Sequence, residues 1–281
     1  MFTLTIKTAT VPGGTKPSED RVRHGVDWMV VADGVTTTAA GVRPRGADYA
    51  DVLAAQTALI ITDRALTLPQ ILAEAITGTA EQLGLGPETE PGRTGQATIA
   101  VGRAVDGWWE AAVIGDCTVA GVRTDDRAPL VLTDTRLADI TRTLPDRRLQ
   151  DGRLLAGEGR IGDDADRQLT AGILERLEHW ANQPDGYGIA AADPKAGLEA
   201  RTARWPLADI RSLLLTTDGG SRATDLYQKL SWDETDRICR RSGPQAVLDL
   251  IRRLDGDDPD GHGWPRRKRH DDATIAHAEV Q

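Results

Sequence analysis

The sequence predicts an α+β fold of antiparallel sheets with helices on their outer faces. Paired apolar runs separated by short polar turns recur along the chain, which is typical of β-hairpins. Stretches with apolar residues at helical spacing stand between groups of strands, so the order does not resemble alternating βαβ units. An apolar run after the last helical stretches predicts a final strand.

Three strands are expected before the first helix. Residues 3–8 alternate apolar and polar side chains, and a Pro-Gly-Gly break follows them. Residues 21–23 and 28–32 predict two further strands around a short turn. If these two strands pair in antiparallel fashion, Asp20 and Asp33 become cross-strand neighbours with Cβ atoms about 5 Å apart.

The middle of the chain predicts two helices and then two pairs of strands. Residues 47–65 and 68–83 carry apolar side chains at helical spacing. A loop rich in Gly, Pro and Glu follows them at 84–95. The expected strand pairs are 96–105 with 108–114, and 120–122 with 130–132.

The last part of the chain begins with a polar segment, residues 133–166, whose composition predicts an irregular and mobile flap. A Ser-Trp-Asp-Glu capping box at 231–234 predicts the start of a helix, and Pro244 suits the first turn of another. The remaining elements are expected as helices at 166–182, 231–241 and 243–254, and strands at 187–192, 210–216 and 273–280.

Composition limits what the chain can be. With 281 residues, 40% of them hydrophobic and 27% charged, it is long enough to bury a large core. It shows no internal repeat or domain boundary, which predicts a single domain over residues 1–281. The net charge of −9 argues against electrostatic binding of nucleic acid. Two cysteines make no disulfide framework, and no apolar run suits a membrane span or signal peptide, so a cytoplasmic protein is expected.

Five acidic clusters at predicted strand ends or turns are the most informative motifs. A carboxylate at the end of a buried strand is costly unless a positive group meets it. Several carboxylates that converge from distant parts of the chain predict a hard-cation site, because Mg²⁺ and Mn²⁺ prefer oxygen ligands. The clusters are Glu19-Asp20, Asp33-Gly34, Gly115-Asp116, Asp218-Gly219 and Asp271-Asp272.

In this order and context the motifs resemble those of the metal-dependent PP2C-type (PPM) serine/threonine phosphatases, in a divergent bacterial-type form. The family pattern also has a Gly-x-Thr before the central hairpin, which residues 92–94 match. It has an Asp-[Asn/Asp]-x-Thr that opens the last strand, which residues 271–274 match. The resemblance spans nearly the whole chain. It implies a four-layer α-β-β-α sandwich with two metal ions between its sheets.

The resemblance also implies which residues hold the two ions, Mg²⁺ or Mn²⁺. Asp33 would bridge both ions, and the carbonyl of Gly34 would join one of them. Asp218 and Asp271 would hold the first ion. Glu19 would hold the second, either by its side chain or through water.

Two further aspartates complete the implied site. Asp20 would position a water or an ion, and Asp116 would be the ligand of a third, weaker ion. Two metals about 3.5–4 Å apart lower the pKa of a water and neutralise phosphoryl oxygens, so no covalent nucleophile is needed. Cys239 does not stand in a Cys-x5-Arg phosphate loop, and although Arg123 follows Cys117 at that spacing, residues 120–122 between them are expected to form a strand.

The chain departs from the family pattern at three places. Many relatives carry a phosphate-binding arginine where this chain has Thr15, with Lys16 beside it. Lysine supplies charge but no bidentate fork, and we predict that Lys16 contacts the substrate phosphate. Val35 stands where animal members have a histidine that bacterial relatives also lack, and Gly220 replaces a bulky apolar residue.

Each motif also has a plain structural explanation. Lys16 could be an ordinary surface lysine, and Asp271 could belong to a solvated acidic pair. The basic run at 266–269 suits a salt-bridged loop or a substrate-docking patch better than a nucleic-acid site, and His270 suits a structural role. Simple turn roles, which Asp-Gly and strand-end aspartates favour, are the alternative for Asp33, Asp116 and Asp218.

We therefore expect a phosphatase that hydrolyses phosphoserine or phosphothreonine on proteins through a water activated by two metals, with Asp20, Asp33 and Lys16 as the catalytic set. Its expected partners are phosphoprotein substrates and a cognate serine/threonine kinase, and neither nucleic acid nor a membrane is expected. The rival is a catalytically weak PP2C-like scaffold that binds a phosphoprotein or regulator, which the missing arginine favours. A hydrolase of nucleotides or small phosphoesters on the same fold stays open.

Overall fold

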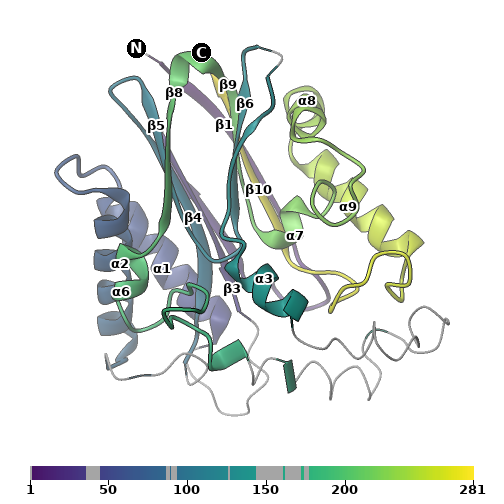
Figure 1. Ribbon diagram of the computed structural model, residues 1–281. Coiled ribbons are helices and arrows are strands. Elements are labelled where there is room, and N and C mark those ends of the chain that lie inside the picture. Colours follow the sequence, from purple (N-terminus) through teal and green to yellow (C-terminus); the bar gives the residue numbers. More distant parts are fainter. Residues whose placement is uncertain are drawn as a thin grey trace.

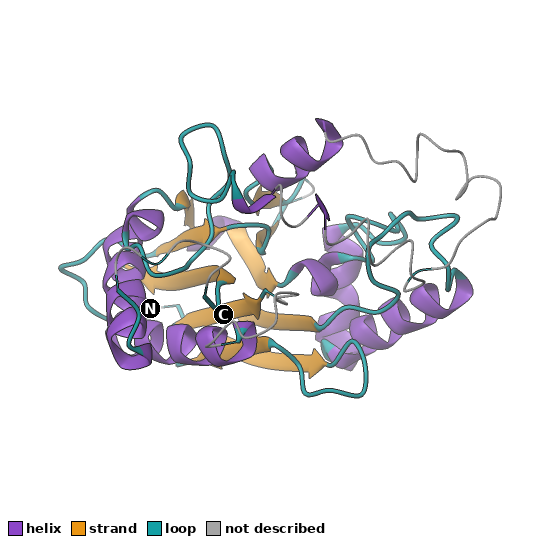
Figure 2. Cartoon of the chain, turned by 90° about the horizontal axis from the view of Figure 1, so that it is seen from below, coloured by secondary structure: helices purple, strands orange, loops and turns teal. Residues whose placement is uncertain are grey.

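Two five-stranded antiparallel sheets lie face to face, and helices cover the outer face of each (Figures 1 and 2). The predicted α+β sandwich is therefore confirmed. The computed structural model describes residues 2–35, 45–86, 89, 94–125, 127–143, 161, 172–173 and 177–281. Among the helices in these ranges, none combines the length and apolar character that a membrane crossing requires.

The first sheet has the strand order β2-β3-β4-β5-β8 and is covered by α1 and α2. Its strands are β2 (Asp20–His24), β3 (Trp28–Gly34), β4 (Ala97–Val105), β5 (Trp108–Ile114) and β8 (Arg201–Pro206). The two helices are α1 (Gly46–Ile60) and α2 (Leu68–Leu83).

The second sheet has the order β1-β10-β9-β6-β7 and is covered by α8 and α9. Its strands are β1 (Leu4–Val11), β10 (Ala273–Val280), β9 (Ile210–Thr216), β6 (Thr118–Arg123) and β7 (Leu130–Leu132). The helices are α8 (Trp232–Ser242) and α9 (Gln245–Asp257), and short helices α3 (Arg136–Thr143), α6 (Lys195–Leu198), η1 (Leu207–Asp209) and α7 (Asp218–Ser221) join other elements.

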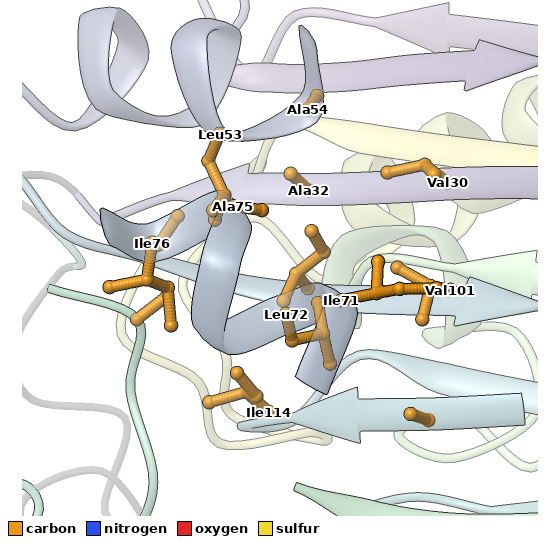
Figure 3. Packing of buried hydrophobic residues seen from close by; sticks show 14 of the residues in the cluster. Val30, Ala32, Leu53, Ala54, Ile71, Leu72, Ala75, Ile76, Val101 and Ile114 are labelled. Atoms are coloured by element: carbon orange, nitrogen blue, oxygen red, sulfur yellow. The ribbon is translucent and has the colours of Figure 1, made fainter. Parts of the chain in front are cut away.

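Strand β3 is an example of a strand that is buried on both of its faces. Val30 and Ala32 point toward the helices and belong to one buried cluster with Leu53 and Ala54 of α1 (Figure 3). Met29 and Val31 belong instead to the cluster between the two sheets. Successive side chains of a strand point to opposite faces, so a strand buried on both faces is apolar throughout.

Two helix starts follow the capping chemistry in the sequence. Thr67 and Gln70 exchange hydrogen bonds between side chain and backbone at the start of α2. Ser231 and Glu234 do the same at α8, which confirms the predicted capping box there. Such reciprocal bonds satisfy backbone N–H groups that have no partner within the helix.

Some predicted elements have different bounds. Strand β1 continues to Val11 because Thr10 and Val11 still pair with β10. Helix α1 ends at Ile60, five residues before the predicted end, and α9 runs on to Asp257.

Other predictions were wrong or fall on residues that are not described. Strand β8 was not predicted, and residues 187–192 form isolated bridges rather than a strand. The segment 133–166 contains the regular helix α3, so its described beginning is not irregular. The rest of the predicted flap, except residue 161, and most of the helix expected at 166–182 lie outside the described residues.

Candidate functional site

The pairing of β2 with β3 places Asp20 directly opposite Asp33, which confirms the proximity predicted from the hairpin. Asp20 is only 3% exposed. Its Oδ2 accepts a hydrogen bond from Thr217 Oγ1 at 2.9 Å, whereas its buried Oδ1 has no hydrogen-bond partner within the described residues. An orphaned buried carboxylate oxygen is costly, and a bound cation or water would satisfy it.

The other three aspartates come from different elements of the two sheets. Asp116 lies in the turn that connects β5 of one sheet to β6 of the other, after Gly115, whose φ of 77° suits glycine. Asp218 follows β9 and begins α7, toward the lower end of the sandwich in Figure 1. Asp271 lies just before β10. The site is therefore assembled from strand ends of both sheets.

The pKa values show that these carboxylates feel one another's charge. Burial is the largest effect on Asp20 and raises its pKa to about 8, and nearby acids add to this rise. Hydrogen bonds from Thr274 and Thr217 oppose it. Burial and then the charges of Asp20, Asp218 and Asp271 raise the pKa of Asp33 well above its usual range. A cluster of this kind is unfavourable unless protons or cations neutralise it.

Asp116 belongs to the same cluster. Burial is the main cause that raises its pKa to about 7, and the charges of Asp218 and Asp271 contribute. Its own backbone hydrogen bond and the charge of Arg267 oppose this rise. Asp116 therefore lies close enough to two other site aspartates to feel their charge, which argues against a role as a merely solvated turn residue.

Close backbone contacts around the site require glycine at two of its motifs. A Cβ atom on Gly34 would lie 2.6 Å from the carbonyl oxygen of Gly46, at the start of α1. A Cβ atom on Gly220 would overlap the carbonyl oxygen of Thr274. The chain therefore has no space for a bulky side chain at the position of Gly220.

The loop that carries Glu19 is held in place by Asp272, a role that the sequence did not reveal. Asp272 Oδ1 accepts a hydrogen bond from Gly13 N at 2.6 Å, and Oδ2 accepts one from Glu19 N at 2.7 Å. The carbonyl of Glu19 in turn accepts a hydrogen bond from Gly34 N at 3.2 Å. The feature of the sequence that could have indicated this role is the second Asp of the Asp-Asp-x-Thr motif, which is Asp272.

Two basic side chains engage Asp271. Lys268 Nζ lies 2.7 Å from Asp271 Oδ1, and Arg222 Nη2 lies 2.9 Å from Oδ2. Burial would raise the pKa of Asp271, but the charges of Lys268 and Arg222 outweigh it and lower that pKa overall. Sequence reasoning missed both partners, because neither follows from the family motif.

Arg222 connects the site to a buried network around Asp255 on α9. Arg222 Nη1 lies 3.3 Å from Asp255 Oδ1, and Tyr227 donates a short hydrogen bond to the same oxygen. The other oxygen of Asp255 pairs with Arg252 at 3.1 Å and with His270 Nδ1 at 3.0 Å. His270 therefore supports the loop before β10 and does not point at the carboxylate cluster.

The remaining candidate residues are placed as follows. Lys16 lies exposed in the loop between β1 and β2, and the structure gives it no close partner in the acidic cluster. Thr94 is fully buried, while Gly92 and Arg93 of the same motif are outside the described residues. In the basic run at 266–269, Arg266 pairs with Asp258 at 2.9 Å, so part of this run is a salt-bridged loop.

The oxygen donors of the site suit hard divalent cations, although the side chains are not yet arranged as a complete set of ligands. Across the described ranges, no three Asp, Glu, His or Cys side chains already stand in an arrangement that could hold an ion. The converging groups are nevertheless all oxygen donors, and the raised pKa values of Asp20, Asp33 and Asp116 reflect negative charge that a cation would relieve. The orphaned Oδ1 of Asp20 points to the same need.

Comparison with known proteins finds similarity at the level of structure alone. No family model and no curated protein sequence matches the chain. A crystal structure of the catalytic domain of the serine/threonine protein phosphatase PstP in complex with two manganese ions is 17% identical, with a TM-score of 0.56 over 100% of this chain and 99% of that one. Stp1 from Staphylococcus aureus is 13% identical, with a TM-score of 0.56 over 99% and 95% of the two chains.

A third structure, PppA, is described as a key regulatory component of the T6SS in Pseudomonas aeruginosa. It is 15% identical, with a TM-score of 0.55 over the full length of both chains. These full-length matches agree with the two antiparallel sheets and their flanking helices. The chain therefore has the fold of the PP2C-type serine/threonine phosphatases that its motifs predicted.

Proposed function

We propose that this chain is a PP2C-type, metal-dependent phosphatase that hydrolyses phosphoserine and phosphothreonine on proteins. The observation that supports it best is the convergence of Asp20, Asp33, Asp116, Asp218 and Asp271 at the strand ends of both sheets. A structural cluster of buried acids would be unfavourable, and solved structures that share this fold are serine/threonine phosphatases. The single-domain organisation over residues 1–281 belongs to the same proposal.

The residues that would hold Mg²⁺ or Mn²⁺ are those that the motifs indicate. Asp33 would contact two ions, Asp218 and Asp271 the first, and Glu19 with the Gly34 carbonyl the second, while Asp116 would serve a third. Such ions, when bound, supply a water of lowered pKa and neutralise the phosphoryl oxygens. The ligation requires small side-chain movements, because the carboxylates do not yet form a closed ligand set in the described residues.

Asp20 would orient a water or an ion through its unpaired Oδ1. Thr217 fixes its other oxygen, and the hydroxyl of Thr217 also accepts a hydrogen bond from Thr274 N at 3.0 Å. This arrangement ties the orientation of Asp20 to the start of β10. A pKa of about 8 means that Asp20 can hold a proton near neutral pH in the metal-free protein.

The test is Mn²⁺-dependent hydrolysis of p-nitrophenyl phosphate and of a phosphothreonine peptide. Asp33→Ala should lower kcat/KM by at least about a hundredfold because it removes the ligand shared by both ions, a loss of roughly 3 kcal/mol of transition-state stabilisation. Asp249→Asn, which changes an exposed carboxylate on α9, is the matched control and should keep normal activity. Normal turnover by folded Asp33→Ala would reject the assignment.

The scaffold hypothesis keeps one specific observation in its favour. Both oxygens of Asp271 are already paired, one with Lys268 and one with Arg222. A protein that retains the fold to bind a phosphoprotein needs no metal at Asp271. It would bind the phosphothreonine peptide without hydrolysing it, at any Mn²⁺ concentration.

Phosphoproteins, and a serine/threonine kinase that modifies the same substrates, are the partners that this function implies. We place the activity in the cytoplasm, as proposed from the sequence. Dephosphorylation of an intact phosphoprotein, measured beside the peptide and a nucleoside monophosphate, separates a protein phosphatase from a hydrolase of small phosphoesters.

A further inference from the structure

The ammonium group of Lys268 stands against the acidic cluster from which a divalent cation would have to draw its ligands. Nζ lies 2.7 Å from Asp271 Oδ1, one of the oxygens assigned above to the first ion. Lys268 lies in the loop that connects α9 to β10. It precedes its partner Asp271 by three residues. Because Lys268 and Asp271 are this close in the sequence, little chain entropy opposes their contact.

The electrostatic surroundings extend beyond this one ion pair. Burial alone would lower the pKa of Lys268, but the charges of Asp271, Asp33 and Asp218 raise it overall. These three aspartates are the ones assigned to the bridged pair of ions. The ammonium thus experiences the same three carboxylates that a metal in the first position would contact.

Each oxygen of Asp271 already has a cationic partner. Arg222 occupies Oδ2, and the side chain of Arg222 is only 8% exposed and tied to Asp255. Arg222 is therefore fixed, whereas the side chain of Lys268 is 50% exposed. Of the two cations on Asp271, Lys268 is the one that can leave, because its flexible stem can carry the ammonium into solvent.

We propose that Lys268 is an internal counter-ion, which neutralises the Asp33, Asp218 and Asp271 cluster in the metal-free protein and is displaced when a divalent cation binds. The proposal rests on the proposed function only in assuming that this cluster is the metal site. It assigns to Lys268 a role in metal affinity and in the stability of the metal-free state. It does not make Lys268 a ligand of the substrate.

The proposal has two measurable consequences. An ammonium 2.7 Å from Asp271 Oδ1 repels a divalent cation that binds the same carboxylate, so removing the amine removes this repulsion and strengthens metal binding. A half-exposed ion pair contributes modestly, and we expect Lys268→Gln to lower the Kd for Mn²⁺ by about threefold to tenfold. Without metal, the same substitution leaves the cluster without its counter-charge, and the melting temperature should fall.

The experiment measures Mn²⁺ binding by calorimetry to chelator-treated protein, and melting temperatures in EDTA and in excess Mn²⁺. Lys195→Gln is the control, since Lys195 of α6 forms an exposed pair with Glu199 at 3.5 Å, away from the acidic cluster. Lys268→Gln should bind Mn²⁺ more tightly, melt lower in EDTA and melt at the wild-type temperature in saturating Mn²⁺. Lys195→Gln should match the wild type in Mn²⁺ affinity, and Lys268→Arg should restore the weaker affinity.

An unchanged or weaker Mn²⁺ affinity of Lys268→Gln would overturn the proposal. If the variant also showed a tenfold higher KM with unchanged Mn²⁺ binding, Lys268 would be a phosphate contact instead. Mn²⁺ binding by Lys268→Gln but not by the wild type would support the proposal strongly. Failure of the proposed function has a different signature, namely Mn²⁺ binding without any phosphate hydrolysis.

Discussion

The acidic cluster should make the metal-free protein less stable at pH 8 than at pH 5. Asp20 carries this effect most directly, because its pKa is raised from 3.8 to about 8 on folding. The folded state then binds the proton more tightly than the unfolded chain does. Its contribution to stability is complete below about pH 4 and is lost as the pH rises through about 8.

The size of the effect follows from the two pKa values. Between pH 5 and pH 8, a carboxyl group with a folded pKa near 8 loses roughly 3–4 kcal/mol of its contribution to the free energy of unfolding. For a chain of this size that corresponds to a fall in melting temperature on the order of 10 °C. Carboxylates with lowered pKa values, such as Asp255 and Asp271, act in the opposite direction but only at lower pH.

The assay is a melting series in EDTA between pH 5 and pH 8 on the wild type, on Asp20→Asn and on the control Asp249→Asn. The wild type and the control should both lose stability as the pH rises, whereas Asp20→Asn should show a clearly flatter profile. Asp33 and Asp116 also have raised pKa values, so the melting temperature of Asp20→Asn should still fall somewhat as the pH rises. Excess Mn²⁺ should stabilise the wild type more at pH 8 than at pH 5, because the ligands must be ionised.

A wild-type melting temperature that stays constant or rises from pH 5 to pH 8 without metal would refute the reasoning. So would an Asp20→Asn profile identical to that of the wild type. Either result would mean that water or a cation reaches Asp20 Oδ1 more freely than its burial indicates.

Three further predictions concern other parts of the molecule. If Lys16 reaches the substrate phosphate, Lys16→Ala should lower kcat/KM about tenfold to a hundredfold, as a charge-assisted contact of roughly 1.5–3 kcal/mol requires, and unchanged steady-state kinetics would make it a surface residue. Arg222→Met should cost about 3 kcal/mol in urea denaturation because it removes a buried cation that Asp255 and Asp271 share, and a loss below 1 kcal/mol would contradict the network. Trp109→Ala should cost about 3–5 kcal/mol in the same measurement because the side chain is fully buried between the sheets, with Trp109→Phe intermediate.

The elements that local pattern determines were predictable from the sequence. The β2–β3 hairpin is short, so its register follows from one turn, and the proximity of Asp20 and Asp33 followed from it. Helix α2 was predicted with its observed bounds from apolar residues at helical spacing, and the capping box and left-handed Gly84 that bound it in the structure agree with that pattern. The ordered motifs then predicted the two-sheet sandwich.

The missed features depend on partners that are distant in sequence. Strand β8 is an edge strand with few apolar residues, and only its pairing with β5 identifies it. Residues 187–192 are apolar and resemble a strand, but they are buried by packing and pair only through isolated bridges. The contact between Arg222 and Asp271 joins side chains 49 positions apart, and no local pattern signals it.

The pairing of β1 with β10 also constrains the order in which the molecule can be completed during synthesis. Strand β1 lies at the edge of its sheet and, among the strands that the structure describes, it pairs with β10 alone, from Leu4 opposite Val280 to Val11 opposite Ala273. During synthesis β1 therefore leaves the ribosome long before β10 has been made. The hydrogen bond from Glu19 N to Asp272, which fixes the loop that carries Glu19, also cannot form until then. Such distant contacts slow folding, and nascent chains that stop before β10 would lack both an edge of the sandwich and a fixed position for Glu19.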